Sequence, residues 1–182
     1  MNIEYSKIFS DVIIFNPIVY EDNRGLFFES FNKKISDVLN VDFIQENHSV
    51  SKRNVIRGLH YQWDKPTGKL VRCISGTLID YVVDIRKDSP TFGKYDSFVL
   101  SDTNKKTVWI PPGFAHGFMS INDETHLIYK CTDVYNKDGE GGIYPFDDDI
   151  SIHFPISKSE AIMSEKDKHA QSLCDYLTDP KF

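Results

Sequence analysis

The sequence predicts an all-β protein, a double-sheet jelly roll with short helices at its C-terminal end. Three observations predict this fold class. β-Branched and aromatic runs dominate the first two-thirds of the chain, turn signals separate them at a spacing typical of sandwiches and barrels, and only the C-terminal end has a helical pattern. Stacking two sheets covers many strand edges, so a chain with many short strands favours this architecture.

The first predicted elements are two strands and a helix. The run VIIFNPIVY at 12–20 has a strand composition that Pro17 interrupts. The residues DNRG at 22–25 are a turn signal, and LFFESF at 26–31 is the next predicted strand. The segment KISDVLN at 34–40 predicts one short helix.

The middle of the chain predicts further strands, and a capping-box pattern then begins the helical end. The run KLVRCISGTLIDYVVDIR at 69–86 predicts two strands joined at Ser75 and Gly76. In its second strand, side chains alternate with the period of a sheet that has two unequal faces. Ile79, Tyr81, Val83 and Ile85 lie on one face, and Asp80, Val82 and Asp84 lie on the other. The other predicted strand segments are 48–62, 92–101, 105–121 and 125–135. The predicted helical end comprises 164–167 and 168–177.

Length and composition indicate one soluble globular domain over residues 1–182. The formal net charge of −6 argues against a general nucleic-acid-binding protein. The N-terminus lacks the pattern of a signal peptide, and no apolar run is long enough to span a membrane. Because Cys73, Cys131 and Cys174 are widely spaced and form no zinc motif, we expect a reduced, cytoplasmic protein.

Two histidines beside glycine residues are the first candidates for chemistry. His60 lies in RGLHYQ at 57–62, and His116 follows the tight turn of IPPGFAHGF at 110–118. A single histidine is most simply a polar group in a half-buried sheet, but with two of them a functional role is an equal alternative. Metal-binding cupins combine a similar P-x-G-x-x-H strand with an H-x-H pattern. Here Gln62 stands where the second histidine of that pattern would be, so we expect no metal site.

Four cations lie in or beside predicted strands, among aromatic and glycine residues. On an acidic chain they suggest a pocket for an anion, although a solvated strand face is the simpler explanation for each cation alone. Tyr129 and Tyr135 lie six positions apart in one predicted strand, which places them on one face. They are either core aromatics or a phenol acid and a stacking platform. The four cations are Arg24, Arg57, Lys69 and Arg72.

Four segments together resemble the dTDP-4-dehydrorhamnose 3,5-epimerase family, from about residue 11 to about residue 167. They are DNRGLFFESF, QENHSVSKRNVIRGLHYQ, GKLVRCISGTLIDYVVDIRKDSPTFGKY and WIPPGFAHGFMSINDETHLIYKCTDVY. The resemblance implies a cupin-like jelly roll without a metal or other cofactor, usually a homodimer. It also implies an isomerase that acts on a nucleotide diphospho-4-keto-6-deoxy sugar in deoxysugar and cell-surface polysaccharide biosynthesis.

The resemblance also implies roles for individual residues. His60 would remove a proton next to the ketone, Lys69 would stabilise the enolate oxygen, and Tyr129 would return a proton on the other face. Asp167 would orient His60, although a carboxylate is also expected there as the last residue of the capping box. Arg24 and Arg57 would hold the diphosphate. The remaining residues expected to line the substrate cleft are Phe27, Glu29, Gln45, Asn47, His116, Tyr135 and Glu140.

One departure from the family keeps alternatives open. Where the family usually has a Trp-Asn or Trp-Asp pair, this sequence has Pro145 and Phe146. We therefore keep three alternatives: the same chemistry on a GDP-linked 4-keto-6-deoxy heptose at C3 alone or at C3 and C5, a 3,4-ketoisomerase of a sugar nucleotide, and a binding module without turnover.

Overall fold

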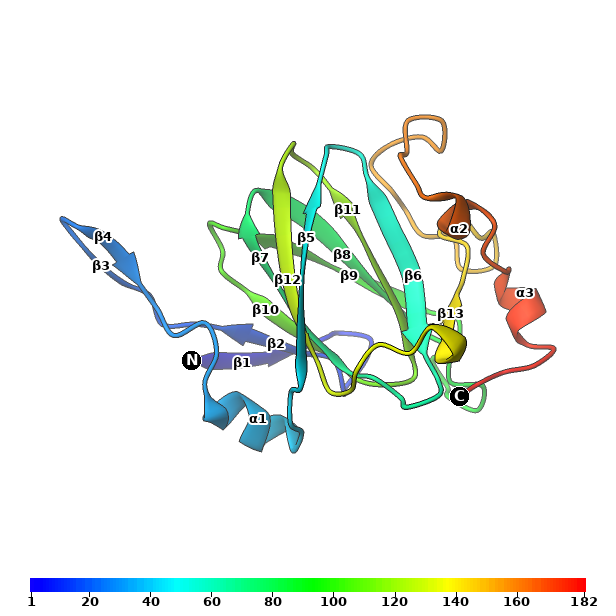
Figure 1. Ribbon diagram of the computed structural model, residues 1–182, viewed down its shortest axis with the longest axis horizontal. Coiled ribbons are helices and arrows are strands. Elements are labelled where there is room, and N and C mark those ends of the chain that lie inside the picture. The colour runs from blue at the N-terminus through cyan, green and yellow to red at the C-terminus, as the bar shows by residue number, and fades with distance from the viewer.

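The computed structural model describes residues 1–182 and contains two antiparallel β-sheets stacked face to face (Figure 1). The predicted double-sheet jelly roll is therefore confirmed. Strands that are distant in the sequence lie side by side, which is typical of this architecture. The six-stranded sheet has the order β1 (Asn2–Tyr5), β2 (Ile13–Asn16), β10 (Thr107–Ile110), β7 (Lys69–Ser75), β12 (Thr125–Cys131) and β5 (Gln45–Ser51). The five-stranded sheet has the order β13 (Glu140–Gly142), β6 (Ile56–Gln62), β11 (Phe114–Ser120), β8 (Thr77–Asp84) and β9 (Tyr95–Ser101).

Both sheets contribute to the apolar core between them. Val71 and Leu127 come from the six-stranded sheet, and Leu78, Val82 and Phe118 come from the five-stranded sheet. All five side chains are buried. Since full burial of a large apolar side chain stabilises by about 1.5–3 kcal/mol, this layer holds the two sheets together.

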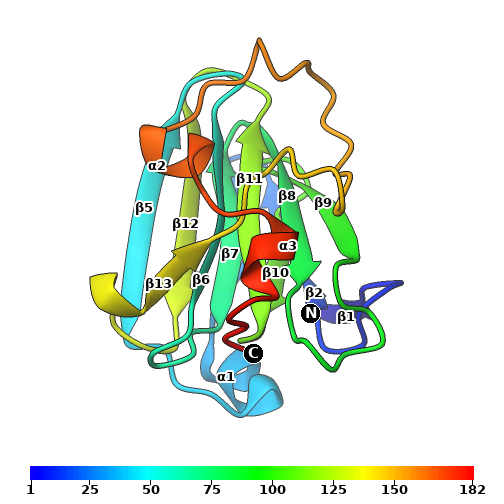
Figure 2. The ribbon, with the colours of Figure 1, turned by 90° about the vertical axis from the view of Figure 1, so that its right-hand side faces the viewer.

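The alternation predicted in β8 separates two apolar layers. Leu78 and Val82 belong to the core between the sheets. Tyr81 points to the other side and packs against Phe154 of the C-terminal segment, with ring centroids 4.7 Å apart. Figure 2 shows this segment crossing the five-stranded sheet. Both faces of β8 are therefore buried, and the unequal faces do not correspond to core and solvent.

The predicted junction at Ser75 and Gly76 connects strands of different sheets. Gly76 has a φ of +80°, a left-handed conformation that glycine adopts without a steric penalty. Because β7 and β8 belong to different sheets, the chain turns a corner here and does not form a hairpin.

The helices are all short. The helix predicted at 34–40 is confirmed, and the helical pattern at the C-terminal end forms two separate turns, which are capped by Ser164 and Ser172. None of the helices has the length and apolar character needed to cross a membrane. The helices are α1 (Lys33–Leu39), the 3₁₀ turn η1 (Lys137–Gly139), α2 (Glu165–Lys168) and α3 (Leu173–Tyr176).

A two-stranded hairpin projects away from the stacked sheets (Figure 1). It consists of β3 (Tyr20–Asp22) and β4 (Gly25–Phe27), so the turn predicted at 22–25 is confirmed. The strand predicted at 26–31 ends early, at Phe27. Tyr20 and Phe27 are 62% and 67% exposed. Aromatic side chains gathered at such exposure are typical of a surface that another molecule covers.

Candidate active site

A cavity of about 460 Å³ lies between the two sheets, next to α2. An adjoining cavity of about 110 Å³ shares three of its lining side chains. Both sheets and the C-terminal segment contribute titratable groups to this space. Those of the larger cavity include His60 on β6, His116 on β11, Lys69 on β7, Tyr129 on β12 and Asp167 on α2.

A larger cavity of about 650 Å³ lies elsewhere, beside Arg86 and the C-terminal Phe182. No histidine, lysine, tyrosine or cysteine lines it. Its arginine, Arg86, already donates hydrogen bonds to Asp84 and Asp11. We therefore place the candidate active site at the cavity that contains His60.

His60 and Asp167 form a hydrogen-bonded pair in the cavity wall, with 2.6 Å between His60 Nε2 and Asp167 Oδ1. Ser164 Oγ accepts a hydrogen bond from the backbone N–H of Asp167, so the predicted helix cap is present. The carboxylate turns to His60, however, and does not close a capping box. Burial acts to raise the pKa of Asp167, but the hydrogen bond and charge of His60 outweigh it, so the pKa lies below its usual value.

Lys69 and Tyr129 reach the cavity from the six-stranded sheet. Lys69 Nζ donates a hydrogen bond to the backbone oxygen of His60 at 3.2 Å. Burial lowers the pKa of Lys69, and nearby acidic groups, including Glu140, act in the opposite direction. Burial raises the pKa of Tyr129, which keeps its phenol protonated at neutral pH. The cavity thus contains a hydrogen-bond donor and a phenol acid on the sheet that faces His60.

His116 lies directly opposite His60 in the ladder between β6 and β11. Its Nε2 lies 2.7 Å from Asp80 Oδ1, and both side chains are buried. Burial lowers the pKa of His116, and Asp80 opposes this shift. The nitrogens Nε2 of both histidines therefore face carboxylates. No group of three or more His, Cys, Asp or Glu side chains is arranged to hold a metal ion.

Arg57 and Lys166 add positive charge to the lining of the 460 Å³ cavity that contains His60. Arg57 Nε donates a hydrogen bond to Ser51 Oγ at 3.0 Å. Lys166 forms an ion pair with Glu140, which lies on β13. Sequence reasoning missed Lys166, although its position directly before Asp167 was an available signal.

The smaller cavity contains the other predicted residues that the fold brings together, and its side chains are linked by hydrogen bonds. Gln45 accepts a bond from the backbone N–H of Tyr135 and donates one to Asn47. The Tyr135 hydroxyl donates to Glu140 at 2.9 Å. Burial acts to raise the pKa of Glu140, but the hydrogen bonds from Lys166 and Tyr135 outweigh it and lower the pKa.

The prediction that Tyr129 and Tyr135 share one strand is wrong. Strand β12 ends at Cys131, and Tyr135 lies in the loop that follows. Both tyrosines still line the smaller cavity. Tyr135 is 57% exposed, as expected of a side chain at the opening of a cavity, whereas Tyr129 lies deeper.

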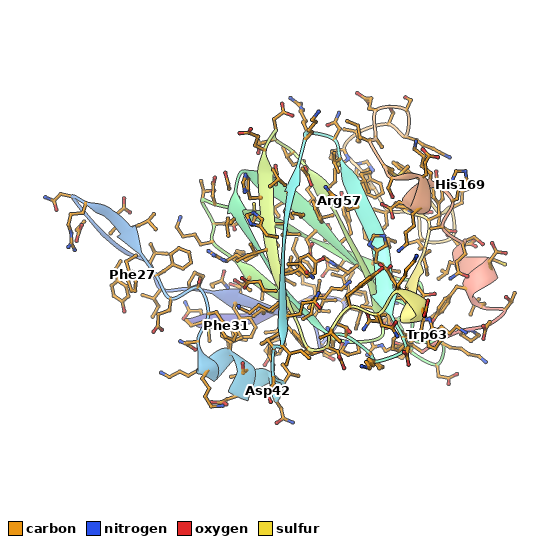
Figure 3. All side chains as sticks on the ribbon, viewed as in Figure 1. Phe27, Phe31, Asp42, Arg57, Trp63 and His169 are labelled. Carbon is orange, nitrogen blue, oxygen red and sulfur yellow. The ribbon has the colours of Figure 1, made fainter.

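Three predicted residues lie on or beside the projecting hairpin, away from the cavity of their own chain. Arg24 is exposed and pairs with Asp22 at 2.7 Å. Glu29 accepts a hydrogen bond from Asn32, just before α1. Figure 3 shows Phe27 on the hairpin, far from Arg57 at the sheets. Within one chain, the structure therefore does not join these residues to His60.

The structure places Arg72, one of the four cations of the predicted anion pocket, away from the cavities at His60. Side chains alternate along β7, so Lys69 and Val71 face the inside whereas Arg72 faces the outer side of the sheet. The Arg72 guanidinium lies 5.4 Å from the centre of the Phe28 ring, a cation–π contact within one chain. Arg72 thus anchors the segment that follows the hairpin and lines neither cavity at His60.

Comparisons with known proteins identify one family. The sequence model of the dTDP-4-dehydrorhamnose 3,5-epimerase family matches residues 7–175. A dTDP-4-dehydrorhamnose 3,5-epimerase of Shigella flexneri is 46% identical over 179 residues, which cover 96% of this chain and 97% of that protein. This chain belongs to the dTDP-4-dehydrorhamnose 3,5-epimerase family. It is therefore an epimerase, as the resemblance predicted.

Solved structures of epimerases have the same fold. A dTDP-6-deoxy-D-glucose-3,5-epimerase of Legionella pneumophila in complex with dTDP-4-keto-L-rhamnose has a TM-score of 0.90 and 40% identity, covering 95% of this chain and 93% of that chain. A 3'-monoepimerase of Streptomyces bikiniensis in complex with dTDP-quinovose has a TM-score of 0.89 and 28% identity, covering 96% of this chain and 89% of that chain.

The departure from the family at Pro145 and Phe146 lies outside the active-site cavities. Phe146 packs against Phe154, with ring centroids 4.8 Å apart, in the layer that covers the five-stranded sheet. The changed pair therefore belongs to the packing of the C-terminal segment and does not contact His60 or Tyr129.

Proposed function

We propose that this epimerase inverts C3 and C5 of a nucleotide diphospho-4-keto-6-deoxy sugar of the dTDP-4-dehydro-6-deoxyglucose type. The observation that carries the proposal is the placement of His60, paired with Asp167, on one sheet and of Tyr129 on the facing sheet, around one cavity. An inversion through an enolate needs a base on one face of the sugar and an acid on the other.

His60 is the proposed base. Because its Nε2 faces Asp167, Nδ1 is the nitrogen that remains to take the proton next to the ketone. The ring becomes an imidazolium, and the carboxylate of Asp167 stabilises that charge and fixes the ring orientation. The lowered pKa of Asp167 keeps its carboxylate ionised throughout.

Lys69 and Tyr129 complete the proposed proton transfer. When C3 or C5 loses its proton, negative charge develops on the C4 oxygen, and a donor in a buried site stabilises this charge more strongly than one in water. Lys69 Nζ, which is held beside the strand of His60, is the proposed donor. Tyr129 then delivers a proton to the opposite face of the carbon, as its raised pKa permits.

The proposed sites for the nucleotide follow from the charges around the cavities. Arg57 and Lys166 hold the diphosphate, since both cations line the 460 Å³ cavity that contains His60. The exposed ring of Tyr135 offers a stacking surface for the base. The complexes of the two solved relatives with dTDP-sugars favour dTDP over GDP as the nucleotide.

We also infer a homodimer in which the hairpin of each chain completes the cavity of the other. The hairpin exposes Tyr20 and Phe27, and it carries Arg24 without access to its own cavity. Strand addition to a neighbouring sheet would cover these side chains and bring a second arginine to the diphosphate. A cytoplasmic location is part of the proposal, because all three cysteines are free thiols.

Solvent exchange tests the proposed reaction. The protein is incubated in D2O with dTDP- and GDP-linked 4-keto-6-deoxy sugars, including a heptose, and the products are analysed by NMR. We expect deuterium at C3 and C5 of the dTDP sugar with the ketone still at C4. Exchange at C3 alone would identify a monoepimerase, and a ketone moved to C3 would identify a ketoisomerase. If no sugar exchanges but one binds, the chain is a binding module.

A further inference from the structure

Strand β8 carries two fully buried aspartates, Asp80 and Asp84, on the face that points to the other sheet. Both carboxylate oxygens of Asp84 accept hydrogen bonds from Arg86, and Oδ2 also accepts hydrogen bonds from Ser89 and Thr91. Asp80 has one hydrogen bond, from His116, and its Oδ2 has no partner within the protein. The protein therefore supplies hydrogen-bond donors to both oxygens of Asp84 but to only one oxygen of Asp80.

Asp80 is costly for the fold if it serves packing alone. Its neighbours on the same face, Leu78 and Val82, are apolar members of the core between the sheets. A carboxylate in such a layer with one oxygen unpartnered loses free energy of solvation that one hydrogen bond does not restore. An apolar side chain would fill the position at lower cost, so the advantage of Asp80 lies in its contact with His116.

The contact with Asp80 determines which nitrogen of His116 carries hydrogen. A carboxylate oxygen accepts hydrogen bonds, so His116 Nε2 is the protonated nitrogen of the ring. Burial lowers the pKa of His116, which keeps the ring neutral and leaves a lone pair on Nδ1. Nδ1 makes no hydrogen bond within the protein, and the side chain lines the active-site cavity. The cavity thus contains a fixed hydrogen-bond acceptor beside the proposed base.

The position of His116 limits which substrate group it can meet. His60 and His116 are paired residues on adjacent antiparallel strands, whose Cα atoms lie about 4.5–5.5 Å apart. A sugar whose reacting carbon contacts His60 therefore brings its neighbouring substituents to His116. A neutral ring there also avoids adding a further positive charge to that of Lys69 beside His60 at the moment when His60 takes its proton.

We propose that Asp80 is a positioning residue that presents the Nδ1 lone pair of His116 to the cavity, where it accepts a hydrogen bond from the C2 or C3 hydroxyl of the sugar. This inference rests on the proposed function, since the hydroxyl belongs to the sugar that His60 deprotonates. It makes His116 a determinant of specificity: a sugar without that hydroxyl leaves a desolvated acceptor unpaired and is rejected.

The first test is the tautomer of His116, measured by ¹⁵N NMR on ligand-free protein. In the parent protein we expect the neutral ring with hydrogen on Nε2. In Asp80→Asn the amide can donate or accept a hydrogen bond, so the spectrum should show a mixture of both His116 tautomers. The kcat/KM of this variant should fall by about 10- to 100-fold, as when a residue that orients a functional histidine is removed. Hydrogen on Nδ1 in the parent, or an unchanged tautomer and kcat/KM in Asp80→Asn, would overturn the proposal.

The matched control is Asp84→Asn, which alters the other buried aspartate of the same strand. It should lower Tm, because Arg86 loses the buried one of its two carboxylate partners, but it should leave the His116 tautomer and the kcat/KM of folded protein unchanged. A shift of the His116 tautomer in this control would mean that any disturbance of β8 has the same effect, which contradicts a specific role of Asp80.

The second test needs no variant of Asp80 and stays informative if Asp80→Asn does not fold. The parent enzyme is given dTDP-4-keto-6-deoxyglucose and its 2-deoxy and 3-deoxy analogues, and kcat/KM is measured for deuterium exchange at C5, a stereocentre that all three sugars share. We expect at least one analogue to have a kcat/KM lower by about 100-fold or more, as when a buried polar group of a site loses its substrate partner. Equal rates for all three sugars would overturn the specificity role. If no sugar is turned over at all, the proposed function fails, while the tautomer measurement still decides the role of Asp80.

Discussion

At the scale of single residues, burial and one close neighbour determine which groups of the cavity hold protons. Burial raises the pKa of Tyr129, and His60 outweighs burial to lower the pKa of Asp167. A protonated phenol on one sheet thus faces the histidine that an ionised carboxylate holds on the other, an arrangement suited to proton transfer on two faces of one carbon. His60, Lys69 and Tyr129 were located by resemblance. For Asp167 the resemblance implied the contact with His60 and the local pattern implied a capping box, and only a contact across 107 positions decides between the two.

The two proton-transfer residues should be separable by isotope exchange. Replacing His60 by asparagine keeps the size of the side chain but removes the base, so deuterium incorporation from D2O at C3 and C5 should stop. Replacing Tyr129 by phenylalanine removes only the acid, so proton removal should continue while inversion slows by about 100-fold or more. NMR of the sugar in D2O measures both. Full inversion rates in Tyr129→Phe would show that another group delivers the proton.

At the scale of elements, the sequence predicted which segments form strands better than it predicted what those strands face. The predicted alternation along β8 is correct. The face of β8 that points away from the other sheet is buried by the C-terminal segment, and no local sequence pattern predicts that this segment packs there. The corner at Gly76 was placed correctly, and only the complete sheet order shows that it changes sheets. The single turn of α2 has the most direct consequence for function, because a helix this short depends on its cap.

Removing the cap of α2 should affect both stability and catalysis. Ser164→Ala leaves the backbone N–H of Asp167 without its acceptor, which should cost about 1 kcal/mol in the free energy of unfolding. It should also lower kcat, because Asp167 then holds His60 less firmly. Ser172→Ala is the matched control, since Ser172 also accepts a hydrogen bond from the third backbone N–H of its helix, α3, away from the cavity. Urea unfolding and exchange kinetics should show similar losses of stability in both variants and a loss of kcat in Ser164→Ala alone.

The end of β8 should give the protein a characteristic dependence on pH. Burial acts to raise the pKa of Asp84, but hydrogen bonds from Arg86, Ser89 and Thr91 outweigh it, and the pKa is lowered. A carboxyl group whose pKa is lower in the folded state stabilises the fold above its unfolded pKa of about 3.9 and loses this contribution as pH falls through the folded value.

Asp84→Asn should therefore destabilise the protein most at neutral pH, by about 3–5 kcal/mol, since it breaks a buried ion pair. The difference in unfolding free energy between parent and variant should shrink below about pH 4. Urea titrations at pH 7, 5 and 3 measure it. A difference that is constant over this range would show that the charge of Asp84 makes no contribution.

At the scale of the whole molecule, the proposed substrate residues divide into two groups that one chain does not unite. His60, Lys69 and Arg57 lie at the cavity, whereas Arg24 and Phe27 lie on the projecting hairpin. Resemblance supplied both groups, but a single sequence does not indicate whether a residue serves its own cavity or that of a second copy. The exposure of the hairpin favours the second copy, since its aromatic side chains find no cover within the chain.

Complementation between two inactive variants decides between these arrangements. Arg24→Ala removes the proposed phosphate ligand from the hairpin, and His60→Asn removes the base from the cavity, so each homodimer should have very low activity. In a mixed dimer, the cavity of the Arg24→Ala chain keeps His60 and receives Arg24 from its partner, which restores one of two sites. Equal mixing and subunit exchange should therefore recover about a quarter of the parent activity, because about half of the dimers are mixed. Light scattering and tagged-subunit pull-down show whether the chains have exchanged. If the hairpin serves its own chain, each mixed dimer contains one cavity without Arg24 and one without His60. The mixture then stays as inactive as its two components, although the chains have exchanged.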